Sequence, residues 1–271
     1  MARSIDNFLH SNQHSVTIET CGKLGIVSCI LKAERESLLK IADEQAASAG
    51  IDFSALKDKW YNRFAALMFE STFDDLRRSL ENLTVISFNY DRCFEHFMYY
   101  SIMTYYGRSP QEAAEVLKGM KVLHPYGMVG YLPWMERSPM AKFGEQVDAE
   151  RLLQLAGQIK TYTEGVDRES SEIQTIHNAL RRALNVIFLG FGYIPLNMDL
   201  LRPNEDPNWT KVSTPQKQYW GTAYHLSDED TNLVTGKVKT LVQTGAVHAK
   251  INNKVTCANL FTEYGFTLSA L

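Results

Sequence analysis

Residues 84–97 read TVISFNYDRCFEHF, and this stretch decides the fold that the sequence predicts. An apolar, β-branched run opens it, which favours a buried strand over residues 84–88. Asn89, Tyr90 and Asp91 follow as a polar turn, and aromatic residues then continue at helical spacing. Open α/β sheets bind their ligands at turns of this kind, outside the carboxyl ends of the strands. The stretch therefore predicts an α/β fold with a ligand site after this strand.

The same pattern repeats further along the chain. A helical crossover leads to a second short apolar strand, residues 121–123, which ends in the polar sequence HPYG. The most apolar run, VIFLGFG at residues 186–192, predicts a central strand buried on both faces. Strands that alternate with helices in this way form a parallel sheet covered by helices.

The flanking regions read as mainly helical. Apolar residues recur at helical spacing through residues 1–80, and we expect residues 226–271 to be mainly helical after a last strand over residues 218–225. The irregular, aromatic stretch at residues 130–143 is either a lid or a packed surface loop, and we favour the loop. A chain of 271 residues fits one large domain spanning residues 1–271.

Composition narrows the class of protein. The hydrophobic content of 45% and charged content of 22% are ordinary for a globular chain, and the net charge of −3 makes nucleic acid an improbable partner. The four cysteines form no CxxC pair, which predicts neither a zinc site nor a disulfide framework. No signal peptide or membrane-spanning run is visible, so we expect a cytoplasmic protein.

The motifs ISFNYD, LHPYG and FLGFG follow the three apolar strands in this order. The ordered set resembles the sirtuin-like domains of bacteria, a family of Rossmann-type NAD-consuming proteins often found in anti-phage defence. The stretches SIDNFL, TYTE and GTAYHLSDED resemble one branch of the same family, so the resemblance covers nearly the whole chain. It implies a three-layer, Rossmann-like domain that takes NAD as its substrate, hydrolyses it and needs no metal.

The resemblance also assigns roles to individual residues. It implies that Asn89 and His124 are catalytic, with Asn89 facing the nicotinamide and ribose and His124 acting on the ribose as base or polariser. Cleavage of an N-glycosidic bond develops positive charge, which a nearby amide or carboxylate stabilises, and a histidine with a near-neutral pKa suits hydroxyl activation. The residues implied to bind NAD are Tyr90, Asp91, Gly190, Phe191 and Gly192.

Two departures from the family pattern support an alternative. The family begins with a strand and a G-A-G-x-S loop that holds the pyrophosphate, whereas this sequence opens at MARSIDNFL. LHPYG also replaces L-H-G, which moves the glycine two places along. The alternative is a non-catalytic, degenerate binding or assembly module, with a second copy or a defence-system protein as partner. A nucleic-acid-binding effector ranks last.

Each site residue also has a structural interpretation. Asn89 and Asp91 are residue types that cap a following helix, and His124 could be satisfied by backbone at a strand end. Gly190 and Gly192 could permit close packing. The remaining histidines lack the spacing of metal ligands, and we interpret them as structural or solvated. They are His10, His14, His96, His177, His225 and His248.

Overall fold

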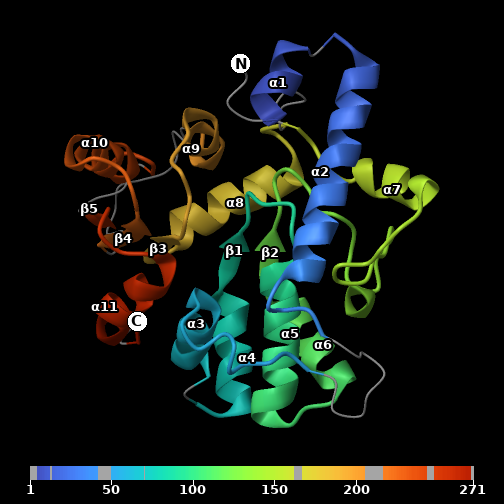
Figure 1. Cartoon of the computed structure of the whole chain (residues 1–271). Coiled ribbons are helices and arrows are strands. Elements are labelled where there is room, and N and C mark those ends of the chain that lie inside the picture. The colour runs from blue at the N-terminus through green and yellow to red at the C-terminus, as the bar shows by residue number, and fades with distance from the viewer. Residues whose placement is uncertain are drawn as a thin grey trace. The chain divides into compact units, whose positions relative to one another are not determined.

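The computed structural model describes residues 5–12, 14–41, 50–69, 71–161, 167–204, 216–242 and 247–269. Residues 42–49 of the predicted helical segment and residues 162–164 of the TYTE stretch lie outside these ranges. The chain is a mixed α/β protein whose strands pair in parallel, as predicted (Figure 1). It divides into two compact units, Met1–Lys57 with Met68–Val166 and Asp58–Leu67 with Asp167–Leu271. The single domain and its three-layer arrangement stay predictions.

The first unit is built around a parallel strand pair, β1 (Thr84–Ile86) and β2 (Lys121–Leu123). The two strands lie side by side in Figure 1, and Ile86 is the register partner of Leu123. Two helices make the crossover between them, α5 (Cys93–Tyr106) and α6 (Pro110–Gly119). This is the βαβ connection that the sequence predicts, and it brings the polar residues after both strands to one edge.

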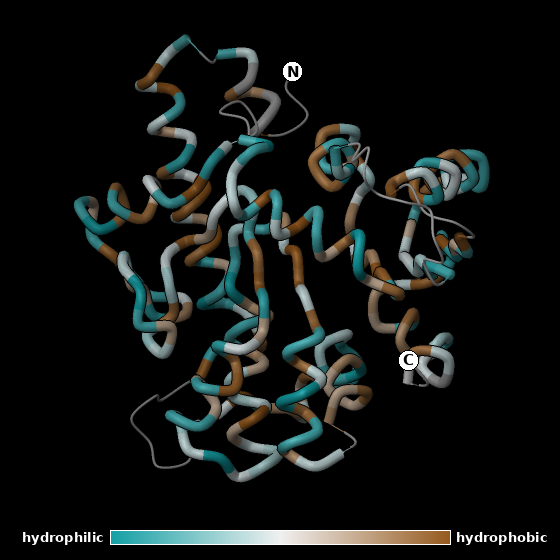
Figure 2. The backbone as a smooth tube through the Cα atoms, turned by 180° about the vertical axis from the view of Figure 1, so that it is seen from behind, coloured by the Kyte–Doolittle hydropathy of each residue, from teal (hydrophilic) through white to brown (hydrophobic). Residues whose placement is uncertain are grey.

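Helices and loops of the first unit share one buried apolar cluster. In it, Val27 and Leu31 of α2 (Val16–Glu36) pack with Leu155 of α7 (Ala149–Ala156) and with Val129. Brown and teal residues alternate along the helices in Figure 2, as expected for helices with one buried face. The remaining elements of this unit are α1 (Ile5–Ser11), α2 (Val16–Glu36), α4 (Phe73–Asn82), η1 (Pro133–Met135) and α7 (Ala149–Ala156).

The second unit contains a three-stranded parallel sheet in the order β3-β4-β5. Its strands are β3 (Asn185–Phe188), β4 (Lys217–Thr222) and β5 (Val247–Asn252). An apolar cluster of Leu260 and Phe261 with Trp60 and Phe64 lies beside it. This unit also holds α3 (Trp60–Met68), except for Met68. Its other helices are α8 (Ser171–Arg182), α9 (Pro195–Leu201), α10 (Asp228–Lys239) and α11 (Cys257–Ser269).

The prediction of the central strand was wrong. Within the described residues β3 pairs only with β4, while β4 has a strand on both sides and is the more deeply buried. Residues 186–192 do not all form the strand either, because β3 ends at Phe188. Counting apolar residues did not place β4 at the centre of the sheet, because this strand buries polar residues, among them Lys217 and Thr222, whose hydrogen-bond partners are 37 and 32 residues away in sequence.

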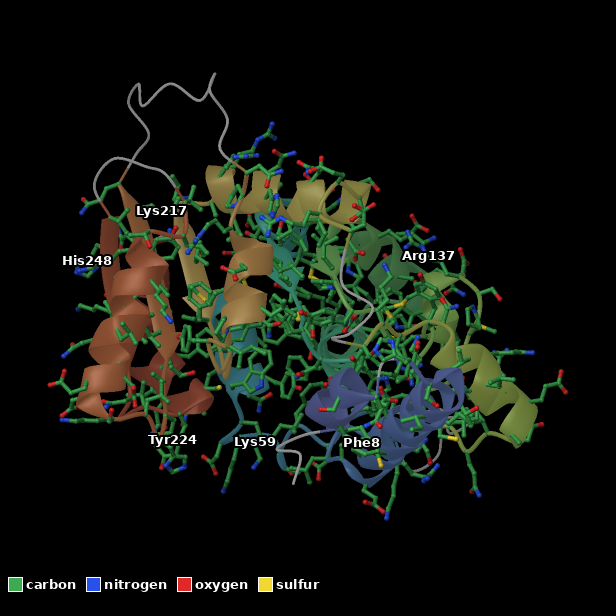
Figure 3. All side chains as sticks on the ribbon, turned by 90° about the horizontal axis from the view of Figure 1, so that it is seen from above. Phe8, Lys59, Arg137, Lys217, Tyr224 and His248 are labelled. Carbon is green, nitrogen blue, oxygen red and sulfur yellow. The ribbon has the colours of Figure 1, made fainter. Side chains whose placement is uncertain are left out.

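A strand within residues 226–271 was also missed. The segment holds the helices α10 and α11, but β5 lies between them at Val247–Asn252 and pairs with β4 over its whole length. Exposed His248 and Lys250 interrupt its apolar character, and His248 lies at the outer margin of the sheet in Figure 3. Such alternation at a sheet edge gives a weak sequence signal. The predicted last strand, residues 218–225, corresponds to β4 and is not the last.

Lys217 joins the start of β4 to the end of α8. Its Nζ donates to the carbonyl oxygens of Leu180, at 2.8 Å, and of Ala183, and the side chain is buried. Burial lowers the pKa of Lys217 to about 8, so the ammonium is the major form at pH 7. A cation at a helix C-terminus satisfies the carbonyls that have no partner within the helix.

We expect Lys217→Met to lower the free energy of unfolding by about 2–3 kcal/mol, because the carbonyls at the end of α8 would lose a charged donor. Urea unfolding followed by circular dichroism measures the change. Lys121→Met is the matched control, since Lys121 starts β2 with an exposed side chain, and its effect is expected to stay within about 0.5 kcal/mol. Equal effects of the two substitutions would contradict this role of Lys217.

Candidate functional site

The ends of β1 and β2 bring two predicted site segments together. The strand-end turn (residues 87–91) follows β1 and contains Asn89, while His124 is the first residue after β2. Because the two strands run parallel and in register, both segments leave the same edge. The ring Nδ1 of His124 lies 3.0 Å from the carbonyl oxygen of Asn89. This contact brings together the two residues that the resemblance implies are catalytic, and their catalytic roles stay predictions.

His124 is enclosed rather than open to solvent. Its residue surface is 4% exposed, and its Nε2 lies 2.8 Å from Oε1 of Glu95, which is 2% exposed. Both ring nitrogens therefore face acceptor atoms, the carboxylate of Glu95 and the carbonyl of Asn89. The sequence pointed to His124 but not to Glu95. Glu95 is the third residue of α5 and lies among aromatic residues in the sequence. Nothing in the sequence distinguished Glu95 from a solvated helix residue.

The charge of His124 follows from these contacts. Burial lowers the pKa of its imidazole, but the Glu95 carboxylate, the hydrogen bond to the Asn89 carbonyl and the nearby charge of Asp91 act in the opposite direction. Together they raise the pKa of His124 above its ordinary value of 6.5. A protonated imidazole has an N–H on each nitrogen and so matches two acceptors. The contacts of His124 therefore favour its protonated form.

Some side chains of the strand-end turn form hydrogen bonds within the protein, and one is exposed. Oδ1 of Asp91 accepts a hydrogen bond from the backbone N–H of Cys93, at 3.0 Å, so Asp91 caps the start of α5 as its structural interpretation predicts. The Tyr90 hydroxyl donates to the carbonyl of Lys160, at 2.9 Å. The Asn89 side chain is exposed and makes no hydrogen bond within the described part of the chain. Asn89 is thus the side chain of this turn that is available to a ligand.

Gly190, Phe191 and Gly192 follow β3 in the second unit. Both glycines have positive φ, 58° and 60°, and the N–H of Gly190 donates to Oγ1 of Thr222 at 3.0 Å. The Phe191 ring packs against the ring of Tyr193, with centroids 5.3 Å apart. The glycines therefore permit a tight turn over the end of β4. Their predicted role beside the ribose and phosphates of NAD stays a prediction.

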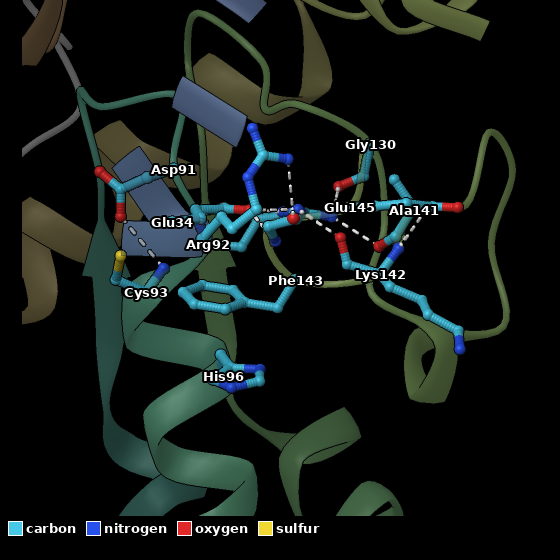
Figure 4. A network of polar contacts seen from close by, with 12 residues as sticks. Glu34, Asp91, Arg92, Cys93, His96, Gly130, Ala141, Lys142, Phe143 and Glu145 are labelled. Carbon is cyan, nitrogen blue, oxygen red and sulfur yellow. Dashed lines mark hydrogen bonds and ion pairs between the residues drawn. The ribbon is translucent and has the colours of Figure 1, made fainter. Parts of the chain in front are cut away.

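A buried ion pair next to the turn was not predicted. Arg92 is 0% exposed, and its guanidinium forms an ion pair with Glu34 of α2 (Figure 4). The same guanidinium donates to the carbonyl oxygens of Ala141 at 2.6 Å, Lys142 at 3.1 Å and Gly130 at 3.4 Å. The partners Glu34 and Arg92 are 58 residues apart in sequence, and no local pattern signals such a pairing. This network fixes the residue that immediately follows Asp91.

The same network shows whether residues 130–143 form a lid or a packed loop. Their carbonyls are bound by Arg92, and the N–H of Gly144 donates to Glu34 at 2.9 Å. The Phe143 ring stacks on the ring of His96, with centroids 3.9 Å apart (Figure 4). Leu132 and Phe143 are buried. The stretch is a packed loop, as we favoured, and not a lid.

Apart from His10, whose side chain lies outside the described part of the structure, the remaining histidines are either buried against backbone carbonyls or exposed. The Nε2–H of His96 donates to the carbonyl oxygen of Leu39 at 3.1 Å, and burial lowers the pKa of His96 to about 3, so the ring stays neutral. His177 is buried with its Nε2 2.9 Å from the Leu200 carbonyl. His14, His225 and His248 are exposed. Among the described residues no group of three or more His, Cys, Asp or Glu is placed to hold a metal ion.

Gly127, the glycine of LHPYG, is required by packing. Its φ is 78°, and a Cβ built on it would lie 1.9 Å from the carbonyl oxygen of Gln158. Gly127 forms an isolated antiparallel bridge with Ile159, beside which Lys160 donates to the carbonyl of Tyr126 at 2.8 Å. The displaced glycine therefore allows residues 158–160 to approach the backbone behind His124.

Two further observations concern the chain and not the site. In the part of the chain that the structure describes, no helix combines the length and the apolar character that crossing a membrane requires. Comparison of the chain with models of known protein families, with curated proteins and with solved structures finds no match.

Proposed function

We propose that this chain is a sirtuin-like domain of Rossmann-like, three-layer architecture that binds NAD and hydrolyses it. The observation that carries the proposal is the hydrogen bond between the ring of His124 and the carbonyl of Asn89. It joins the two implied catalytic residues at the carboxyl ends of neighbouring parallel strands, where α/β proteins bind nucleotides. The order of the motifs ISFNYD, LHPYG and FLGFG supports the same function.

The residues of the turn suit this chemistry. NAD supplies an N-glycosidic bond whose cleavage develops positive charge on the ribose. The exposed amide of Asn89 is free to orient the nicotinamide end, and Asp91, whose Oδ1 accepts from the N–H of Cys93, adds a carboxylate to the same turn. Amide dipoles and carboxylates fixed in this way stabilise developing positive charge. His124 holds the peptide of Asn89 through the hydrogen bond from its Nδ1 to the Asn89 carbonyl oxygen.

Nicotinamide release from NAD tests the proposal. We expect turnover by the wild-type protein and a loss of at least about 100-fold in Asn89→Ala, because one preorganised polar group contributes on that scale. Asn82→Ala is the matched control, since Asn82 is an exposed asparagine at the end of α4, and it should keep wild-type turnover. Absence of turnover in the wild-type protein at high enzyme concentration, with or without an activating partner, would refute the catalytic proposal.

The second candidate is a non-catalytic binding or assembly module on the same fold. The observation that favours it is the enclosure of His124, whose two ring nitrogens already face Glu95 and Asn89. Calorimetric titration with NAD separates the two functions. Binding of NAD without nicotinamide release would support the module, while release would support the hydrolase.

The setting of the protein is also a proposal. We infer a cytoplasmic bacterial protein in an anti-phage defence system, with a second copy or a defence-system protein as its partner. The resemblance of the ordered motifs supports the defence role. The net charge of −3 gives no support for nucleic acid as a partner.

A further inference from the structure

The ring of His124 is placed between two acceptors that belong to different elements. Nε2 faces the carboxylate of Glu95 on α5 at 2.8 Å, and Nδ1 faces the carbonyl of Asn89 in the strand-end turn at 3.0 Å. A neutral imidazole has a single N–H and can donate to only one of them. At the other nitrogen a lone pair would then oppose an acceptor oxygen in a buried site, which costs free energy. With Glu95 as a carboxylate, both contacts are satisfied together only in the protonated ring.

The two hydrogen bonds differ in strength. The bond to Glu95 joins a cation to a carboxylate, and such charge-assisted bonds are about twice as strong as bonds between neutral groups. When His124 loses one proton, the remaining proton therefore stays on Nε2 towards Glu95. The bond that is lost is the one from Nδ1 to the carbonyl of Asn89.

We propose that His124 is a protonation latch for the strand-end turn: as an imidazolium it fastens the Asn89 peptide to α5 through Glu95, and as a neutral imidazole it releases that peptide. The latch acts on the turn that contains Asn89 and Asp91, but it rests on the contacts of His124 and not on the proposed hydrolase function. It would regulate the exposure of this turn whatever ligand the turn binds.

The charges around His124 set the direction of the pH dependence. The charged groups that act on its ring within the described residues are Glu95 from α5 and Asp91 from the turn itself, and both favour the imidazolium. They raise the pKa of His124 above 6.5 in the folded protein in spite of its burial. The fastened state is therefore complete below pH 6.5 and is lost as the pH rises through the raised pKa of His124.

Nitrogen-15 NMR of the histidine rings tests the latch directly. In the wild-type protein we expect the His124 ring to carry protons on both nitrogens at pH 6 and to titrate above pH 6.5. In Glu95→Gln the midpoint should fall by about one pH unit or more, because a neighbouring opposite charge shifts a pKa by that amount. His96 is the internal control, since burial holds its pKa at about 3 and it should not titrate between pH 5 and 8.

Hydrogen exchange then measures the release of the turn. Above the His124 midpoint the amides of residues 87–91 should exchange at least several-fold faster, after correction for the intrinsic effect of pH, while amides of the α5 interior stay protected. A neutral His124 ring at pH 6, or exchange in the turn that does not follow the His124 titration, would overturn the proposal. The wild-type titration decides the question even if Glu95→Gln does not fold.

Discussion

Arg92→Met is expected to lower the free energy of unfolding by about 3–5 kcal/mol, which is the range for removing one partner of a buried ion pair. The substitution leaves the carboxylate of Glu34 buried without its counter-charge, since Glu34 is 1% exposed. It also removes the donors that bind the carbonyls of Ala141 and Lys142. Methionine keeps much of the volume of the side chain, so the loss reports on charge and hydrogen bonding. Urea unfolding followed by circular dichroism measures it.

Two further variants make the result specific. Arg77→Met changes an exposed arginine on α4 and should alter stability by no more than about 0.5 kcal/mol. The double variant Glu34→Met with Arg92→Met should lose less than the sum of the two single losses, by about 2 kcal/mol, because it leaves no unpaired charge. An Arg92→Met protein as stable as the Arg77→Met protein would show that the ion pair contributes little to the fold.

Local signals predicted the part of the fold around β1 and β2. The β-branched run before Ser87 and the helical spacing after Asp91 each depend on neighbouring residues, and both elements form where expected. The Pro at the first position of α6, after the Ser109 cap, is a signal of the same kind. Such patterns act over a few residues, so they can be read from the chain directly.

Long-range pairing explains what could not be predicted. The Arg92 side chain binds the carboxylate of Glu34, 58 residues before it, and the carbonyl oxygen of Ala141, 49 residues after it. The position of β4 at the centre of its sheet depends on strands on both sides of it. Its buried Lys217 looks like a surface residue until the end of α8 is in place. Spacing along the chain does not encode these contacts.

The candidate site was predictable to a similar extent. Parallel strands place their carboxyl ends at one edge, so the proximity of Asn89 and His124 follows from the order of the motifs. The enclosure of His124 by Glu95 does not, because it depends on how α5 packs against the end of β2. The sequence therefore indicated which residues lie together at this edge, but not that Glu95 encloses His124.

Gly127→Ala is expected to lower the free energy of unfolding by about 3–5 kcal/mol, through backbone strain and overpacking together. Alanine at φ 78° is strained, and its Cβ would lie 1.9 Å from the carbonyl oxygen of Gln158, a backbone atom that cannot move without breaking the bridge to Ile159. Thermal and urea unfolding measure the loss. An unchanged stability would show that residues 158–160 do not pack this closely behind His124.

The same substitution at Gly25 should have the opposite sign, which separates the effect of Gly127 from a general effect of alanine. Gly25 lies within α2 with no atom near the place of a Cβ, so Gly25→Ala should raise stability by about 0.5–1 kcal/mol. A glycine placed for a ligand would tolerate alanine in the fold and lose only binding. Because Gly127 faces backbone on the side where its Cβ would point, we expect Gly127→Ala to lower stability and not only binding.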